Sequence, residues 1–221
     1  MRVRNWIVLS LMVAAFSGPL PAYAEDGLDY AGYVRFERAV AADVDAYWAG
    51  RAESLGHSYD SPRLVLAARG RFVRSGCGAE VGDPANTRRG DVSPAFECPR
   101  DNSVDLSSGW TYRDLYQAFG DFAAAVAIAH EWAHHAQQVF GTTATTPMRL
   151  ELQADCWAGV WGRDADDRGL VEAGDLDEAA KALYAMGDYE YDNPDHHGTP
   201  AQRRAAFRRG FLGGDLTSCR G

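Results

Sequence analysis

Two histidines spaced four residues apart, with a glutamate between them, form the pattern HExxH. His130, Glu131 and His134 carry it, within AIAHEWAHHAQQ (127–138). On an α-helix, residues four apart lie on one face, so both imidazoles can reach a single metal ion. Glu131 is turned by about 100° from His130, which brings its carboxylate near the position where a metal-bound water would lie. These residue types at this spacing predict a zinc hydrolase site with Glu131 as general base.

A third protein ligand is needed, because catalytic zinc sites combine three protein ligands with a water. Glu151, the first residue of ELQAD (151–155), is the candidate. Asp155 shares its helical face and can accept a hydrogen bond from the second ring nitrogen of a ligand histidine. The alternative is an amphipathic helix whose histidines pack on a core, which explains none of the spacings. We expect one Zn²⁺ per chain, held by His130, His134 and Glu151.

Helical signals surround both motifs. Asp121 is the expected N-cap of the HExxH helix and Gly141 follows its C-terminus, while the ELQAD helix is expected from Pro147 to about Arg163. Further helices are predicted over residues 29–49 and over residues 111–119, the second with Thr111 as its N-cap. Another is expected from residue 175 to near residue 187, where Asp175 and Glu178 have the spacing of a capping box. The last follows Thr199, and Gln202 completes a second capping box there.

The remaining periodicity is that of short strands. RLVLAA (63–68) is β-prone, and residues 103–106 alternate polar and apolar side chains, which predicts an edge strand near the site. By analogy with zinc peptidases, such an edge would hold a peptide by strand addition. The pattern as a whole predicts an α+β fold that is mostly helical and has a small sheet.

Several segments together resemble the bacterial putative neutral zinc metallopeptidases. They are HEWAHHAQQ (130–138), MRLELQADCWAGVW (148–161) and HGTPAQRRAAF (197–207), extended upstream by SPRLVL (61–66), Cys77, Cys98 and CPRDNSVDL (98–106). The likeness covers most of the chain after about residue 45. In that family the motif typically reads HEVGHH, so Trp132 and Ala133 differ at two variable positions without removing a ligand. The resemblance implies a zincin-like domain with Glu151 as third ligand and Asp155 serving the zinc site, as in gluzincins.

His197 stands directly before the helix that Thr199 caps. Gluzincin peptidases commonly place a downstream histidine or tyrosine to stabilise the oxyanion, so the resemblance nominates His197 as a catalytic residue. A surface histidine is the alternative, because nothing in the spacing forces it into the site. Tyr189 and Tyr191 are the nearest hydroxyl donors upstream, and Arg203, Arg204, Arg208 and Arg209 are expected to form a solvated helical face.

The first 24 residues have the layout of a secretory signal peptide. A basic start is followed by an apolar run from Trp6 to Phe16 and by the small-residue ending Ala22-Tyr23-Ala24. The run is shorter than the ~20 residues of a spanning helix, although an uncleaved anchor is the alternative. We therefore expect a secreted or periplasmic protein without a stable membrane span, with one domain over residues 25–221.

Charge and cysteine content agree with export. Without residues 1–24 the chain keeps 20 basic and 31 acidic residues, a net charge of about −11. That charge makes nucleic-acid partners improbable; it suits solubility and leaves room for a preference for basic substrates. Four cysteines allow three pairings. We favour Cys77–Cys98, which closes a local loop, and Cys156–Cys219, which ties the Glu151 helix to the C-terminus.

The function favoured by these residues is metal-assisted hydrolysis of a peptide bond in a peptide or protein substrate. One alternative is another zinc amide hydrolase of the deformylase kind, which would need a reduced Cys98 as ligand. A second is a non-catalytic, zinc-stabilised binding or scaffold protein, against which the presence of Glu131 argues. The sequence leaves substrate and oligomeric state open.

Overall fold

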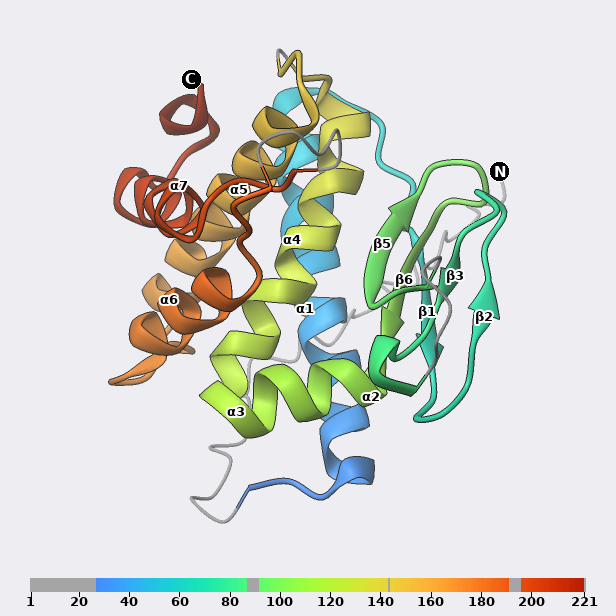
Figure 1. Ribbon diagram of the computed structural model, residues 1–221. Helices are drawn as coiled ribbons and strands as arrows, with labels where there is room; N and C mark the ends of the chain where they lie inside the picture. Colours follow the sequence, from blue (N-terminus) through green and yellow to red (C-terminus); the bar gives the residue numbers. More distant parts are fainter. Residues whose placement is uncertain (1–26, 87–91, 143, 191–195, 221) are drawn as a thin grey trace, which may run out of the picture.

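The computed structural model describes residues 27–86, 92–142, 144–190 and 196–220. The expected signal peptide, residues 1–24, and the expected domain start at residue 25 lie outside this part. In the described residues the fold is mostly helical with two small sheets, an α+β arrangement in which the sheets lie beside a group of packed helices (Figure 1). No helix in these ranges is both long and apolar enough to cross a bilayer.

The elements follow one another along the chain as α1 (Tyr30–Leu55), β1 (Arg63–Ala67), β2 (Val73–Arg74), β3 (Glu80–Val81), β4 (Val92–Ser93), β5 (Ala95–Cys98), β6 (Ser103–Ser107), α2 (Ser108–Trp110), a π-helical segment (Thr111–Tyr116), α3 (Gln117–Phe119), α4 (Asp121–Phe140), α5 (Pro147–Asp167), α6 (Asp175–Ala185) and α7 (Pro200–Gly213). Short 3₁₀ turns cover Pro84–Asn86 and Leu216–Cys219.

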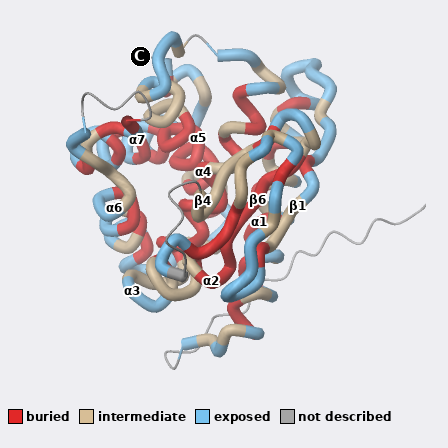
Figure 2. Tube along the Cα trace, turned by 45° about the vertical axis from the view of Figure 1, so that its right-hand side comes forward, coloured by how far each residue is buried: buried red, intermediate tan, exposed pale blue. Residues whose placement is uncertain are grey.

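Helix α4, which carries HExxH, is the centre of the core. It packs against α1, α5 and α6, and Figure 2 shows it buried along most of its length. Ala124, Ala129 and Ala133 are fully buried, so small side chains let the neighbouring helices approach it closely. Gly120, not Asp121, is its N-cap. The Phe122 N–H donates to the carboxylates of Asp121 and Glu178, at 2.8 and 3.1 Å.

Helices α5 and α7 cross at very short range because each presents a glycine. A Cβ at Gly210 would lie 1.8 Å from the Cys156 carbonyl oxygen, and one at Gly159 would lie 2.1 Å from that of Phe207. Helix α5 continues to Asp167, past the expected end near Arg163. The Cys156–Cys219 disulfide then fastens α5 to the chain end, as the sequence favoured.

The Cys77–Cys98 disulfide is also present, so all four cysteines are paired. It joins the loop after β2 to the end of β5, within the Gly- and Pro-rich region. Cys98 therefore has no thiolate to offer a metal, and the premise of the deformylase-like alternative is absent from this structure.

The prediction of an edge strand over residues 103–106 was wrong. The main sheet has the order β1-β6-β5, with β6 in the centre, parallel to β1 and antiparallel to β5. Every residue of β6 is buried (Figure 2). Its polar residues do not face solvent, since the Ser103 hydroxyl donates to the buried Asp105 carboxylate at 2.5 Å. The edge strand is β5, on the side of the sheet next to α4.

Besides the N-cap of α4, two further expected caps differ from the prediction. Ser107 caps the helical segment that begins at Ser108, while the Thr111 hydroxyl donates to buried Glu37 at 2.8 Å. Gly174 is the N-cap of α6, and no capping box forms there, because Glu178 reaches across to α4. The box of Thr199 and Gln202 at the start of α7 is confirmed.

Candidate metal centre

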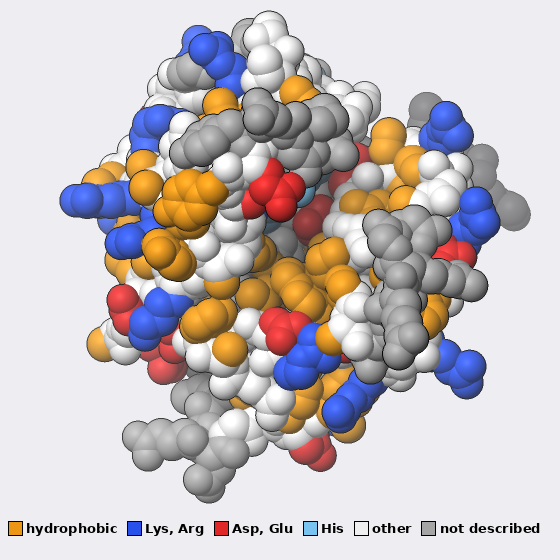
Figure 3. Space-filling model, in the orientation of Figure 1, with side chains coloured by type: hydrophobic (Ala, Val, Ile, Leu, Met, Phe, Trp, Pro, Cys, Tyr) orange, Lys and Arg blue, Asp and Glu red, His pale blue; other side chains and the backbone are white. Residues whose placement is uncertain are grey.

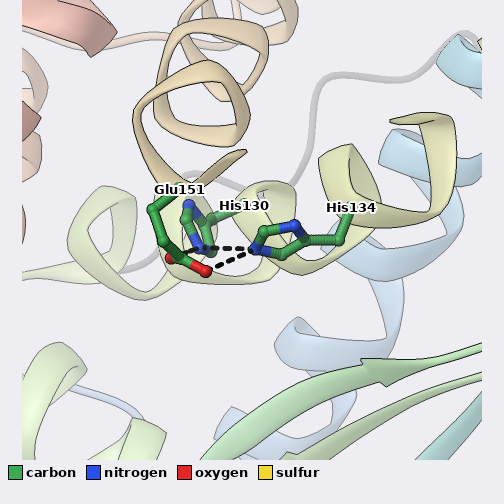
Figure 4. Close-up of side chains that lie close together, drawn as sticks. All are labelled: His130, His134 and Glu151. Carbon is green, nitrogen blue, oxygen red and sulfur yellow. Dashed lines mark hydrogen bonds and ion pairs between the residues drawn. The ribbon is translucent and has the colours of Figure 1, made fainter. Parts of the chain in front are cut away.

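Helices α4 and α5 bring His130, His134 and Glu151 together. The Nε2 atoms of the two histidines lie 3.1 Å apart. The Glu151 carboxylate approaches both rings, at 3.1 Å from His130 Nε2 and 3.4 Å from His134 Nε2. Figure 4 shows the three side chains pointing toward one another, the histidines from one helix and the glutamate from the next. One ligand atom from each lies within 4.8 Å of the others.

These separations fit a tetrahedral zinc ion. Ligand atoms at about 2.0–2.1 Å from such an ion are about 3.3 Å from one another, close to the 3.1–3.4 Å found here. Two imidazole Nε2 atoms facing each other at this distance also need a cation or a shared proton between them. Two nitrogens and a carboxylate oxygen are donors that zinc prefers. The residues therefore fit the metal that the sequence predicts.

The electrostatics of the three side chains favour a positive charge at their meeting point. Burial favours the neutral ring of His130, but the charge of Asp155 and the hydrogen bonds to Asp155 and Glu151 outweigh it and raise the pKa of His130 to about 10. Burial likewise opposes ionisation of Glu151, yet the two histidines lower the pKa of its carboxyl. A bound metal cation would take the place of the protons that the histidine nitrogens and the Glu151 carboxylate otherwise share.

Asp155 lies behind His130, where the sequence placed it. Its carboxylate is fully buried and lies 2.9 Å from His130 Nδ1. A proton on Nδ1 then points to Asp155 and leaves Nε2 directed at Glu151 and His134. Burial would raise the pKa of Asp155, but the Arg203 guanidinium outweighs it and lowers that pKa.

Arg203 is the residue that the sequence analysis missed. Its side chain is 4 % exposed, so it does not belong to the solvated face expected of the α7 arginines. It binds Asp155 through two hydrogen bonds of 2.8 Å and donates to the Met186 carbonyl at 3.0 Å. A signal was present, because the buried positions of α7 recur at helical spacing and Arg203 is one of them: Pro200, Arg203, Ala206, Phe207, Gly210 and Phe211.

An open cleft of about 640 Å³ gives access to the group, and Glu131 contributes to its wall. Figure 3 shows a hollow near the middle of this face, with hydrophobic side chains in its lower part and acidic ones at its upper end. Burial raises the pKa of Glu131. No described residue makes a hydrogen bond to its carboxylate.

His197 also lines the cleft, with a half-exposed side chain. Its backbone N–H donates to Asp188 at 3.1 Å, which holds the backbone next to the start of α7. The neighbouring His196 is buried and pairs with the same carboxylate. Tyr189 is 62 % exposed, and Tyr191 lies outside the described residues. His197 is therefore better placed than Tyr189.

Comparison with known proteins gives one family and several relatives. The family model described as "Putative neutral zinc metallopeptidase" matches residues 24–221. The uncharacterized protein YpfJ of Escherichia coli (strain K12) is 36% identical over 211 residues, which is 84% of this chain and 70% of the relative. The uncharacterized protein Rv2575 of Mycobacterium tuberculosis (strain ATCC 25618 / H37Rv) is 31% identical over 214 residues, 82% of this chain and 68% of the relative. No solved structure matches.

Proposed function

We propose that this chain, which belongs to the family of putative neutral zinc metallopeptidases, is a zinc-dependent peptidase that hydrolyses peptide bonds with Glu131 as general base. The observation that carries the proposal is the convergence of His130, His134 and Glu151 at 3.1–3.4 Å, with Glu131 in the wall of the same cleft. A purely structural zinc site would use a fourth protein ligand and would need no adjacent base.

Zinc in this site would lower the pKa of a bound water to about 7 and polarise the scissile carbonyl. Glu131 accepts a proton from the attacking water and delivers it to the leaving amine.

The other side chains of the site position the His130 ring and stabilise the negative charge of the oxyanion. Asp155, held by Arg203, fixes the ring of His130 so that its Nε2 faces Glu151. His197 at the cleft wall supplies a ring N–H that can donate to the oxyanion as negative charge develops. The zincin-like character of the domain is part of the same proposal.

The peptide substrate would lie along β5. This strand is at the edge of its sheet, and Ala95, Phe96 and Glu97 line the cleft together with His130 and His134. An edge strand offers unpaired backbone N–H and C=O groups, to which an extended peptide can add as a further strand. The sequence predicted this role for residues 103–106, which lie in the central strand β6. We propose it instead for the neighbouring edge strand β5.

Two disulfides fit an exported protein, because they persist in oxidising compartments. We propose that residues 1–24 are a cleaved signal peptide and that residues 25–221 act as one domain in the periplasm or outside the cell.

The test is Glu131→Gln, with the same exchange at Glu53, an exposed residue of α1, as control. Glu131→Gln should keep stoichiometric zinc, measured by metal analysis, and should abolish hydrolysis of a mixed peptide library. Glu53→Gln should retain both. Equal turnover by Glu131→Gln and the parent would refute the mechanism, and loss of zinc from it would make Glu131 a ligand.

A further inference from the structure

A second carboxylate of the cleft has no role in the mechanism above. Glu97 is on edge strand β5 and lines the cleft together with His130, Glu131 and His134. Its side chain is only 5 % exposed. Its Oε1 atom is buried and accepts no hydrogen bond, unlike the carboxylates of Glu151 and Asp155.

The lack of a donor is costly for an ionised group. A buried carboxylate normally accepts several hydrogen bonds or pairs with a cation, and without them its desolvation costs several kcal/mol. The nearest cationic candidate is His135, whose Nδ1 lies 3.8 Å from Oε1, beyond hydrogen-bond range. The second ring nitrogen of His135 also lacks a partner. Among the described residues, Glu97 Oε1 therefore accepts no hydrogen bond, and the basic group facing it is the His135 ring at 3.8 Å.

Glu151 and Arg203, two other charged side chains of the cleft wall, already have partners. Glu151 is engaged by the two histidines, and Arg203 donates to Asp155 and to the Met186 carbonyl. Glu97 does not belong to the group that could hold the metal, which consists of His130, His134 and Glu151. Apart from the proposed base Glu131, the acid that remains unmatched is Glu97, in the wall along which a substrate would lie.

We propose that Glu97 selects substrates with a cationic group next to the scissile bond, either a lysine or arginine side chain or a free amino terminus. The inference rests on the proposed peptidase function. A cation entering the cleft would supply the missing donor, and charge-assisted hydrogen bonds are among the stronger contacts in proteins. The net charge of −9 would raise the local concentration of such substrates.

The first experiment compares amino-blocked peptides that differ in one residue, lysine or norleucine, placed in turn at each position flanking the cleaved bond. A further pair differs only in a free or acetylated amino terminus, which separates the two sources of the cation. The parent should prefer one cationic peptide by about 10- to 100-fold in kcat/KM, as expected for a charge-assisted hydrogen bond. Glu97→Gln should reduce that preference, measured as the ratio of the two kcat/KM values, to about twofold while keeping zinc content.

Two further variants exclude a merely structural effect. Glu97→Asp keeps the acidic group on a shorter side chain and should restore part of the preference, whereas Glu53→Gln, at an exposed position of α1 outside the cleft lining, should leave it unchanged. A parent without preference, or a Glu97→Gln variant that keeps it, overturns the proposal.

Binding separates this proposal from the peptidase function. Zinc-loaded Glu131→Gln should bind the preferred cationic peptide more tightly than its neutral analogue in fluorescence anisotropy, and adding Glu97→Gln should remove the difference. Cation-dependent binding without hydrolysis by the parent would keep the role of Glu97 and refute the peptidase. Hydrolysis of neutral and cationic peptides at equal rates would support the peptidase function and refute the role of Glu97.

Discussion

Replacing Arg203 with methionine tests whether the site depends on the buried pair behind it. Arg203 and Asp155 are 4 % and 0 % exposed in their side chains, and they share two hydrogen bonds of 2.8 Å. Removing the guanidinium leaves the Asp155 carboxylate buried with His130 as its remaining partner. Breaking a buried pair on one side costs about 3–5 kcal/mol. For a chain of this size, each kcal/mol lowers Tm by about 2–4 °C, so Arg203→Met should melt about 6–20 °C below the parent.

The assay is thermal unfolding with excess zinc and with chelator, together with zinc affinity from chelator competition. Zinc affinity should also fall, by about 10- to 100-fold, because Asp155 no longer orients His130 firmly. Arg204→Met, an exposed neighbour on α7, should change stability by less than about 0.5 kcal/mol.

Removing both charged side chains distinguishes the effect of breaking the ion pair from the effect of losing side-chain packing. Asp155→Leu combined with Arg203→Met leaves no buried charge at this position, and such replacements are often neutral or stabilising. The double variant should therefore melt well above Arg203→Met in the presence of chelator, while still binding zinc weakly. The explanation of this pair is wrong if Arg203→Met melts within about 2 °C of the parent. It is also wrong if the loss of Tm in the double variant equals the sum of the losses in Asp155→Leu and Arg203→Met.

The other predictions concern the ligands, the oxyanion and pH. Glu151→Ala should nearly empty the site in metal analysis, whereas Asp155→Ala should weaken zinc binding or activity by about 10- to 100-fold; the reverse result would exchange the two roles. His197→Ala should lower kcat by about 10²- to 10³-fold with zinc content unchanged, and a kcat within about twofold of the parent would return His197 to the surface. Burial and repulsion from neighbouring carboxylates raise the pKa of Glu178 to about 7 and that of Asp175 to about 6. The folded chain thus holds these protons more tightly than the unfolded chain, so their contribution to stability falls as pH rises from about 4.5 to 7. Glu178→Gln should melt above the parent at pH 8 and close to it at pH 4.5, and an equal offset at both pH values would contradict the cause.

The sequence could predict the group of candidate ligands because local geometry decides most of it. His130 and His134 share a face through helical periodicity alone, and α4 does hold them side by side. Glu151 comes from the next helix, where the ELQAD pattern supplied the nomination. Their roles as zinc ligands stay a prediction that the variants above test.

Tertiary context decided what the sequence could not. Alternation over residues 103–106 predicted a solvent-facing edge, but the polar side chains of β6 bond one another inside the protein. Glu178 suited a capping box by position, yet its carboxylate accepts a hydrogen bond from the Phe122 N–H at the start of α4. Arg203 suited an arginine-rich face, yet it lies on the buried side of α7. For Glu178 and Arg203 the polar side chain found a partner distant in sequence, which no local pattern reveals.

The partners of each acid at the site indicate its task. Asp155 is matched by Arg203 and His130, and Glu151 by the two histidines, so these carboxylates are fixed in place and serve to position and to bind. Glu131 and the Oε1 atom of Glu97 accept no hydrogen bond from described residues, although both side chains line the cleft. Keeping a carboxylate desolvated and unmatched is unfavourable in the free protein. A carboxylate of this kind is useful where a water or a cationic substrate group binds to it. This explains why the two acids without such partners are Glu131, the proposed base, and Glu97, the proposed specificity residue.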